Sequence, residues 1–415
     1  MATRYSLNGE ISSFFESNTT VTRQQCDNFA LSRATGQVNP AQIQGVWSYT
    51  LIAGNSKVFQ FRAQSSRLDM DIMSLAKAIH PQFVAGCKYH GTIGQSRPLH
   101  IYEIDNLPGA TYVMARDSSD IQPPDAIFRQ RSTVKDYASF FAQSWNSSQQ
   151  PEDAAALLAE FHSKFDLLSQ SLPSRFASNL GRVRPDLPAL FSGALPFALS
   201  HWDLCEMNVL INPETGNITW IVDWAEARIL PFGFSLWGLE NVLGYMDSKG
   251  WHYYDNRREL EDLFWQTFLR EARNVSDTDL RLIRVARMAG LFCRYGFIAH
   301  GKTVRGVVDQ TDAPSLRYLD AFCTTDDWAT TTPEDIHEKS FLSDLSAIEY
   351  LMSSHIGLGM AFVALELSHA WLESKSCQEV RRAFFHVSRV QHDGAVILDD
   401  ELAHLRNVFG KDLKP

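Results

Sequence analysis

Residues 200–211 read Ser-His-Trp-Asp-Leu-Cys-Glu-Met-Asn-Val-Leu-Ile, and residues 218–224 read Ile-Thr-Trp-Ile-Val-Asp-Trp. The first stretch has the spacing His-x-Asp-x-x-x-x-Asn followed by an apolar run, and the second is an apolar run that leads into Asp223. Between them, the Pro-Glu-Thr-Gly sequence of residues 213–216 is typical of a turn. We therefore expect two antiparallel strands that bring Asn208, before the first strand, beside Asp223, after the second.

The residue types in this segment fit one kind of chemistry. Phosphoryl transfer needs a carboxylate that orients and deprotonates the attacking hydroxyl, and oxygen ligands that hold Mg²⁺ on the nucleotide phosphates. Carboxylate and amide oxygens favour Mg²⁺ over Zn²⁺. The bare spacing occurs by chance in many unrelated chains, but the turn and the second apolar run make a catalytic site the better interpretation here.

The segment resembles the catalytic loop of the aminoglycoside phosphotransferase and choline kinase branch of the protein-kinase-like fold, which reads His-Gly-Asp-x-x-x-x-Asn. The resemblance covers about residues 40–310, and residues 224–233 and 236–244 are similar to fungal members of that family. It implies an α+β fold with two lobes. The N-lobe would hold a small antiparallel sheet and one helix, and the larger C-lobe would be mainly helical.

The resemblance also implies roles for individual residues. Asp203 would be the catalytic base, and Asn208 and Asp223 would be Mg²⁺ ligands. His201 would support the loop. Trp202 stands where the family has glycine, and its bulk either narrows the acceptor side of the cleft or fills space in the core.

The sequence pattern of the N-terminal half predicts a β-sheet whose strands are separated in the chain by one helix. Residues 44–62 read as a β-hairpin with a turn at Gly54-Asn55-Ser56, and residues 69–79 have helical spacing that ends before a proline. Residues 99–104 and 111–114 read as two further strands. The resemblance places the hinge that receives adenine at residues 102–109.

The same resemblance implies a basic residue on the third strand that contacts the nucleotide phosphates and pairs with an acid on the next helix. Strand alternation puts Gln60 and Arg62 on one face. Arg62 is therefore the candidate, with Gln60 beside it and Asp71 or Asp69 as its partner, and a solvent-exposed Arg62 is the alternative. The hairpin over the phosphates would be residues 46–58, which lack a glycine-rich loop.

The rest of the chain predicts a helical domain and an extension. Residues 132–172 and the chain after 235 have helical spacing. We expect an N-terminal helical segment, an N-lobe, a helical C-lobe and a helical extension, at residues 1–40, 41–107, 108–323 and 331–415. The extension packs on the helical lobe or forms a dimer interface through its apolar run at residues 356–372, so a monomer and a homodimer are both open.

Composition excludes several classes of protein. The chain has 415 residues, 45% hydrophobic and 21% charged, as in folded globular domains. With 38 Lys and Arg against 48 Asp and Glu, the net charge of -10 argues against binding a nucleic-acid backbone. The sequence has no signal-peptide pattern and no apolar run long enough to span a membrane, so we expect a cytoplasmic protein. The six cysteines form no C-x-x-C pair, and Cys205 is expected to be inert.

These patterns predict an ATP- and Mg²⁺-dependent phosphotransferase that acts on a hydroxyl group of a small molecule. Glu226, Glu240 and Asp247 could line the acceptor pocket and favour a cationic or polyhydroxyl acceptor, although solvated or capping acids are common. One alternative is a catalytically idle, kinase-like binding module. Another is an enzyme that phosphorylates a metabolite transiently to drive dehydration or cyclisation.

Overall fold

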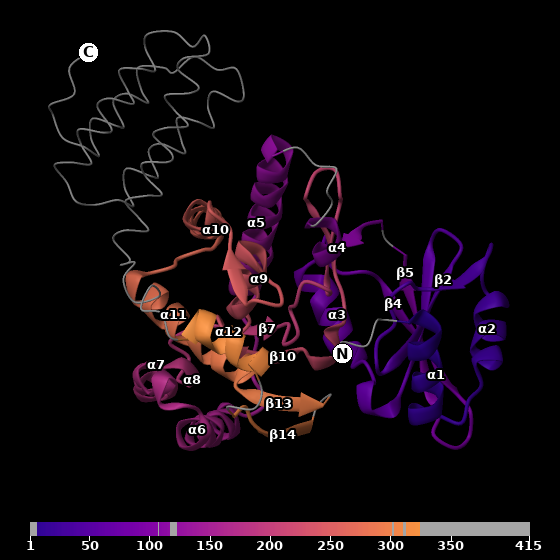
Figure 1. Ribbon diagram of the computed structural model, residues 1–415, viewed down its shortest axis with the longest axis horizontal. Coiled ribbons are helices and arrows are strands. Elements are labelled where there is room, and N and C mark those ends of the chain that lie inside the picture. Colours follow the sequence, from indigo (N-terminus) through magenta and orange to yellow (C-terminus); the bar gives the residue numbers. More distant parts are fainter. Residues whose placement is uncertain (1–5, 107, 117–122, 301–302, 310–312, 324–415) are drawn as a thin grey trace, which may run out of the picture. The chain divides into compact units, whose positions relative to one another are not determined.

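The structure is a computed structural model, which describes residues 6–106, 108–116, 123–300, 303–309 and 313–323 (Figure 1). The chain divides into two compact units, residues 1–330 and 331–415. The predicted extension, with its apolar run at residues 356–372, lies outside the described residues. No described helix is both long and apolar enough to cross a lipid bilayer.

The N-terminal part is built on a five-stranded antiparallel sheet with the strand order β1-β2-β3-β5-β4. Its strands are β1 (Val38–Pro40), β2 (Ser48–Ala53), β3 (Lys57–Arg62), β4 (Cys87–Ile93) and β5 (Leu99–Asp105). The β2–β3 pair confirms the predicted hairpin, and β5 confirms the strand predicted at residues 99–104. Strand β4 is an addition to the predicted elements. Its register shifts between Tyr89 and Thr92 and Gly91 has a φ of 84°, so it lacks the regular alternation by which strands are recognised.

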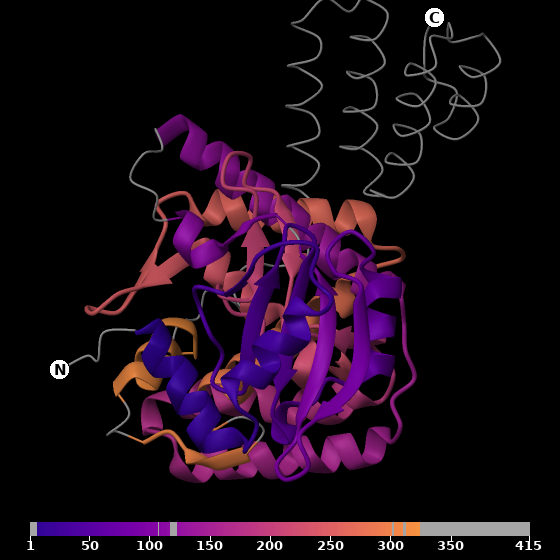
Figure 2. The same cartoon turned by 90° about the vertical axis from the view of Figure 1, so that its right-hand side faces the viewer.

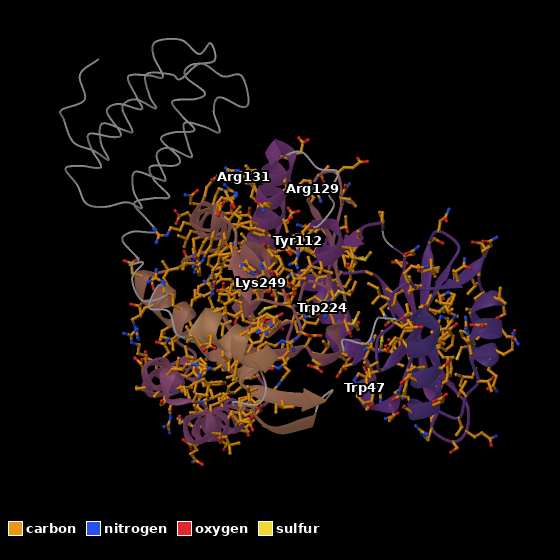
Figure 3. The ribbon with its side chains drawn as sticks, in the orientation of Figure 1. Trp47, Tyr112, Arg129, Arg131, Trp224 and Lys249 are labelled. Atoms are coloured by element: carbon orange, nitrogen blue, oxygen red, sulfur yellow. The ribbon has the colours of Figure 1, made fainter. Side chains whose placement is uncertain are left out.

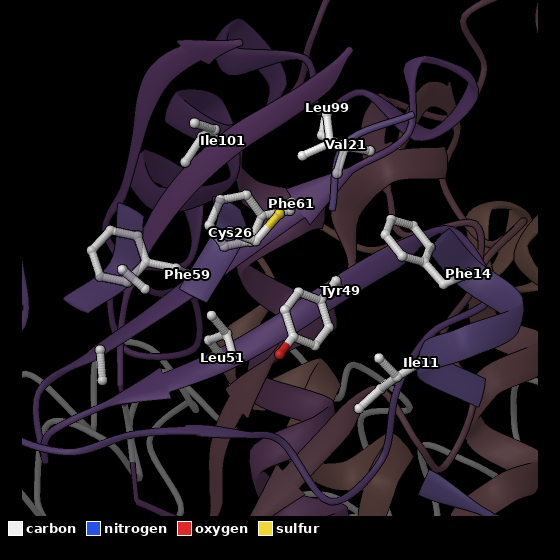
Figure 4. Close-up of a cluster of buried hydrophobic side chains, with 12 residues drawn as sticks. Ile11, Phe14, Val21, Cys26, Tyr49, Leu51, Phe59, Phe61, Leu99 and Ile101 are labelled. Carbon is white, nitrogen blue, oxygen red and sulfur yellow. The ribbon is translucent and has the colours of Figure 1, made fainter. Parts of the chain in front are cut away.

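Helices cover both faces of this sheet. α1 (Leu7–Asn18) and α2 (Arg23–Leu31) pack on one face (Figure 2). Phe59 and Phe61, which alternate with Gln60 and Arg62 along β3, point to that side and join a buried cluster with Tyr49 and residues of both helices (Figure 4). On the opposite face, the Tyr102 hydroxyl contacts the backbone of Leu68, just before α3 (Met70–Ile79).

Helix α3 confirms the helix predicted at residues 69–79. It begins where the Asp69 carboxylate accepts hydrogen bonds from the backbone N–H of Asp71 at 2.9 Å and of Ile72 at 3.3 Å. An aspartate in this position satisfies N–H groups that have no partner within the helix. Asp69 is therefore a helix cap.

The remainder of the first unit is mainly helical, with small two- and three-stranded sheets. Its helices are α4 (Tyr112–Arg116), α5 (Pro123–Asn146), α6 (Ala154–Ser171), α7 (Ala177–Val183), α8 (Leu187–Phe191), α9 (Glu240–Leu243), α10 (Arg257–Glu271), α11 (Asp277–Tyr295) and α12 (Ala313–Cys323). Its strands are β6 (Ala110–Thr111), β7 (Phe197–Ser200), β8 (Val209–Ile211), β9 (Ile218–Ile221), β10 (Arg228–Pro231), β11 (Gly244–Met246), β12 (Trp251–Tyr253), β13 (Phe297–His300) and β14 (Thr303–Val307). The α+β class is thereby confirmed.

One local prediction was wrong. The strand expected at residues 111–114 stops at Thr111, which pairs with Leu210, and α4 begins at Tyr112. The next backbone contact, from Val113 N to Glu206 O, is made to the loop before β8 and not to the strand itself. The described chain after residue 235 is mostly helical, as predicted, and β11–β12 and β13–β14 add two short hairpins to it.

The β8–β9 hairpin confirms the turn predicted at residues 213–216. Asn212 Oδ1 accepts hydrogen bonds from Glu214 N at 2.8 Å and Thr215 N at 3.3 Å, and Gly216 closes the turn with a φ of 75°. A Cβ atom on Gly216 would lie 2.3 Å from Arg129 O. The turn is thus packed against the backbone of α5, which fixes the hairpin and the residues at its base.

Candidate active site

The loop between β7 and β8 is held in one shape by its own hydrogen bonds. Cys205 N donates to Asp203 O at 2.9 Å, and Asn208 N donates to Cys205 O at 3.0 Å. The Asn208 amide Nδ2 donates to Asp203 Oδ2 at 3.0 Å and to Asp203 O at 2.7 Å. These bonds place the carboxylate of Asp203 and the amide of Asn208 side by side.

Asp223 lies next to this loop, as the strand pattern predicts. Val209 pairs with Ile221, and Val222 N donates to Asn208 O at 2.9 Å. Asp223 itself has a φ of 63° and a ψ of 61°, a left-handed conformation that is unfavourable for residues other than glycine. Such strain is typical of functional sites, where the surrounding structure holds a residue in a required position.

Two oxygen atoms beside the loop fit a divalent ion. Asn208 uses its Nδ2 on Asp203, and Asp223 uses Oδ1 in its ion pair, so Asn208 Oδ1 and Asp223 Oδ2 make no hydrogen bond to the described residues. Amide and carboxylate oxygens are hard ligands, and Mg²⁺ is commonly held by one or two carboxylates together with substrate phosphates. The chemistry of the donor atoms therefore fits Mg²⁺.

Arg62 is buried, with 4% of its side chain exposed, and it pairs with Asp223. Its Nη2 lies 3.0 Å from Asp223 Oδ1 and 2.6 Å from Ser66 Oγ, its Nε donates to Ser66 O at 2.7 Å, and its Nη1 donates to Gln60 Oε1 at 3.1 Å. The solvent-exposed alternative for Arg62 is thus excluded. The ion pair joins the end of β3 to the end of β9, 161 positions apart in the sequence.

The partner expected for Arg62 was wrong. Asp69 and Asp71 were the candidates, but neither forms an ion pair with Arg62 in the described part of the chain. Asp69 is occupied in capping α3, and Asp71 is exposed to solvent. The partner comes from outside the N-terminal sheet, because the end of β3 faces the β8–β9 hairpin.

The hairpin expected over the phosphates turns away from Arg62. The turn of the 46–58 hairpin lies at the far end of β3 from Arg62, where Asn106 N donates to Ser56 O at 2.8 Å. The connection between β1 and β2, residues 41–47, lies at the Arg62 end, because Ser48 pairs with Arg62 and Ala63 N donates to Trp47 O at 3.0 Å. Figure 3 labels Trp47, the last residue of this connection, and Trp224, which follows Asp223 in the sequence.

A glutamine side chain shapes the 41–47 connection in place of a glycine-rich sequence. Buried Gln44 donates through Nε2 to Ala41 O at 2.8 Å and to Thr50 O at 2.9 Å, and its Oε1 accepts from Thr50 N at 2.8 Å. These three bonds close the loop on β2. A phosphate-covering role for residues 41–47 remains a proposal.

Two buried histidines lie beside the loop between β7 and β8. His201 donates from Nε2 to Val222 O at 2.8 Å and meets the Trp224 ring edge-on at 4.7 Å, which ties β7 to the strand before Asp223. His80 stacks on Phe140 at 4.1 Å, and its Nδ1 lies 2.9 Å from Gln143 Oε1. Burial lowers the pKa of His201, and burial lowers the pKa of His80 to about 4. Both rings are therefore neutral parts of the core at physiological pH.

Trp202 packs against α6. Its ring lies 6.3 Å from the Phe161 ring and 5.8 Å from Lys164 Nζ, which sits over its face. Of the two roles that the sequence left open for Trp202, this geometry favours filling space beside a helix over narrowing the acceptor side.

The acidic residues expected at the acceptor side are largely engaged. Glu240 is buried against Arg287 and accepts a hydrogen bond from the Tyr253 hydroxyl at 2.9 Å. Asp247 accepts from Lys249 N at 2.7 Å and lies 2.9 Å from His252 Nε2. The charge of Glu240 is therefore offset by Arg287, whereas Asp247 remains a partly exposed carboxylate whose partners are backbone N–H groups and a histidine.

Sequence reasoning missed two side chains that hold the loop. Arg294, near the end of α11, pairs through Nη2 with Asp203 Oδ1 at 2.7 Å. Buried Asn241 of α9 donates from Nδ2 to Leu204 O at 3.0 Å. Both residues lie in helices distant from the loop in sequence, and no sequence motif near them indicates that they contact it.

Cys205 is correctly excluded as a nucleophile. Burial, with a further contribution from Asp203, raises the pKa of its thiol to about 11. A thiol with so high a pKa supplies almost no reactive thiolate near neutrality.

No protein-family model matches the sequence, and no curated protein matches it. Solved structures do match. An amicoumacin kinase, hAmiN, in complex with AMP-PNP, Ca²⁺ and Ami, has a TM-score of 0.50 and 15% identity, and the match covers 80% of this chain and 99% of that chain.

Two further structures match with lower TM-scores. The GDP complex of aminoglycoside 2'-phosphotransferase-IIIa has a TM-score of 0.42 and 13% identity, with coverage of 82% of this chain and 100% of that chain. Macrolide 2'-phosphotransferase MphH from Brachybacterium faecium has a TM-score of 0.42 and 12% identity, with coverage of 66% and 91%. Sequence identities this low support similarity of fold and nothing further. The likeness to hAmiN, together with the strand order and the loop, shows that the chain has the two-lobed α+β fold of the protein-kinase-like class.

Proposed function

We propose that this protein is an ATP- and Mg²⁺-dependent phosphotransferase that acts on a hydroxyl group of a small molecule. One observation carries the proposal. The carboxylate of Asp203, the amide of Asn208 and the carboxylate of Asp223 come together at the base of the β8–β9 hairpin, and each retains an oxygen lone pair for a ligand. This is the arrangement that phosphoryl transfer requires.

In this mechanism, Asp203 accepts the proton of the acceptor hydroxyl as its oxygen attacks the γ-phosphorus. A bond forms between that oxygen and phosphorus, and the bond from phosphorus to the β,γ-bridging oxygen breaks, so that ADP leaves. Bound Mg²⁺ would neutralise charge on the phosphates, and Asn208 Oδ1 and Asp223 Oδ2 are the atoms that would hold it. Arg62 and Gln60 lie on the nucleotide side, where Arg62 fixes Asp223 and offers positive charge to the phosphates.

A nucleotide-dependent thermal melt tests the proposal first. A site that is saturated at about 100 times Kd gains roughly 2.7 kcal/mol of stability. We expect ATP or its analogue AMP-PNP to stabilise the protein in the presence of Mg²⁺ and much less in the presence of EDTA. The alternative, a catalytically idle binding module, predicts no Mg²⁺-dependent stabilisation. The ion pair between Arg62 and Asp223 favours that alternative, because it engages a basic residue expected on the phosphates. GTP in the same melt decides between the two nucleotides.

A screen of acceptors with ADP release as the readout tests the second part of the proposal. Because Glu240 and Asp247 are engaged, the library should include neutral polyols and aromatic alcohols besides aminoglycosides and choline. The mass of the product separates the alternatives. A phosphorylated product supports simple transfer, and a dehydrated or cyclised product released with phosphate supports transient phosphorylation.

A further inference from the structure

The carboxylate of Asp203 is held at both oxygen atoms. Asn208 Nδ2 binds Oδ2 at 3.0 Å from within the loop, and Arg294 Nη2 binds Oδ1 at 2.7 Å from α11. We infer that Arg294 is a positioning residue for the phosphotransfer reaction, which acts by fixing the orientation of Asp203. The inference rests on the proposed function, because it assumes that Asp203 is the catalytic base.

The guanidinium of Arg294 is itself fixed from behind. It lies over the ring of Trp237 at 4.9 Å, and Trp237 is completely buried. A guanidinium that stacks on an aromatic ring is preorganised for its ion pair, because its plane cannot rotate freely. Arg294 therefore presents its N–H groups to Asp203 in a defined direction.

The helix that carries Arg294 cannot shift relative to the segment that follows β10. Gly290 precedes Arg294 by one helical turn, and a Cβ atom at Gly290 would lie 2.0 Å from Phe234 O. Without a side chain at this position, α11 approaches the backbone at Phe234 closely. This close packing fixes the position of α11 and therefore how far the Arg294 side chain extends towards Asp203.

The exposure of the pair agrees with a role at the reaction centre. About a third of each side chain is accessible, 31% for Arg294 and 29% for Asp203, so the pair borders solvent. Burial lowers the pKa of Arg294, but the Asp203 carboxylate and other neighbours raise it overall, so the guanidinium remains charged. Its charge also offsets that of Asp203, which otherwise repels the terminal phosphate.

A structural ion pair and a positioning residue predict different kinetics. Misplacement of a reacting group by about 1 Å can cost about 10²-fold in rate. We therefore expect Arg294→Ala to lower kcat by roughly 10- to 100-fold and to leave the KM for ATP and the Mg²⁺-dependent stabilisation by AMP-PNP within about twofold of the wild type. A purely structural pair predicts a lower melting temperature with kcat retained.

The experiment uses the full chain and an acceptor from the screen, or ATP hydrolysis if none is found. Arg281→Ala is the matched control, because exposed Arg281 lies on the same helix and pairs with Asp186 at 2.8 Å, away from the candidate site. Arg294→Lys keeps the charge without the planar fork and should be intermediate. Millimolar guanidinium should restore part of the kcat of Arg294→Ala but none of that of Asp203→Asn.

Several outcomes overturn the inference. A kcat for Arg294→Ala within twofold of the Arg281→Ala control would do so, as would loss of AMP-PNP stabilisation, which would place Arg294 on the phosphates instead. If Arg294→Ala does not fold, a fully active Arg294→Lys has the same consequence. If nucleotide with Mg²⁺ does not stabilise the wild-type protein, the proposed function fails together with this inference. If the wild type is active and Arg294→Ala is equally active, only this inference fails.

Discussion

Two arginine–carboxylate pairs flank the candidate site, and they are built differently. Arg62 is 4% exposed and donates to three neighbouring groups besides Asp223, whereas Arg294 is 31% exposed and pairs with Asp203 while lying over Trp237. The first pair joins the N-terminal sheet to the end of β9. The second joins α11 to the catalytic loop within the helical part.

This difference implies a division of labour. A buried arginine with its hydrogen bonds satisfied is costly to remove, because its partners lose their bonds inside the protein. A partly exposed pair contributes little to stability, since solvent screens its charges. We therefore expect the Arg62 pair to govern folding and nucleotide binding, and the Arg294 pair to govern turnover.

The largest expected effect comes from the two carboxylates themselves. Asp203→Asn should lower kcat by about 10²- to 10⁴-fold, the usual range for loss of a general base, while Mg²⁺-AMP-PNP still stabilises the protein. Asp223→Asn should abolish the Mg²⁺ dependence of that stabilisation. Steady-state kinetics and thermal melts of both variants check this, and the mechanism fails if both retain wild-type turnover.

Removal of Arg62 tests the structural half of the comparison. Arg62→Met should lower the free energy of unfolding by about 2–4 kcal/mol, because Ser66, Gln60 and Asp223 lose their donor. Arg294→Met should lower it by less than about 1 kcal/mol. Urea unfolding measures the free energy of unfolding of both variants. Arg67→Met is the control for the loop between β3 and α3, because Arg67 is exposed. Equal losses at the two positions would refute the proposed division.

The buried histidines under the loop give a pH dependence that neither pair supplies. His80 has its pKa lowered by burial to about 4, and burial also lowers that of His201, whereas histidine in the unfolded chain titrates near 6.5. Between these values the unfolded state binds more protons, so stability falls as pH drops from about 6.5 towards 4.

Melting temperatures from pH 7.5 to 4.5 check this expectation. His80→Gln should be less stable at pH 7.5 but should lose less stability on acidification. A profile as steep as that of the wild type would show that His80 is not responsible.

The smallest expected effect is at Trp202, which contacts α6 rather than either pair. Trp202→Phe should leave kcat and the KM for ATP within about twofold of the wild-type values. It should lower the free energy of unfolding by roughly 1 kcal/mol, because a smaller ring fills this half-buried position. A large change in the KM for the acceptor would instead place Trp202 in the acceptor site.

Much of the site followed from local sequence. The spacing from His201 to Asn208, the turn at residues 213–216 and the apolar run before Asp223 predicted a hairpin, and the register of β8 and β9 brings Asn208 and Asp223 together. Strand alternation also separates Phe59 and Phe61 from Gln60 and Arg62, and the structure buries the two rings. Such features depend on backbone periodicity and turn geometry, which neighbouring residues determine.

The tertiary structure alone decided which side chains meet across long sequence separations. Arg62 binds Asp223 and not an acid on α3. The connection at residues 41–47, and not the turn at residues 54–56, lies at the Arg62 end of the sheet, and Arg294 reaches Asp203 from a helix without any motif. Each of these depends on how distant segments pack and on where a strand or helix ends in space. Periodicity assigns a residue to a face, but only the packed fold decides what lies opposite that face.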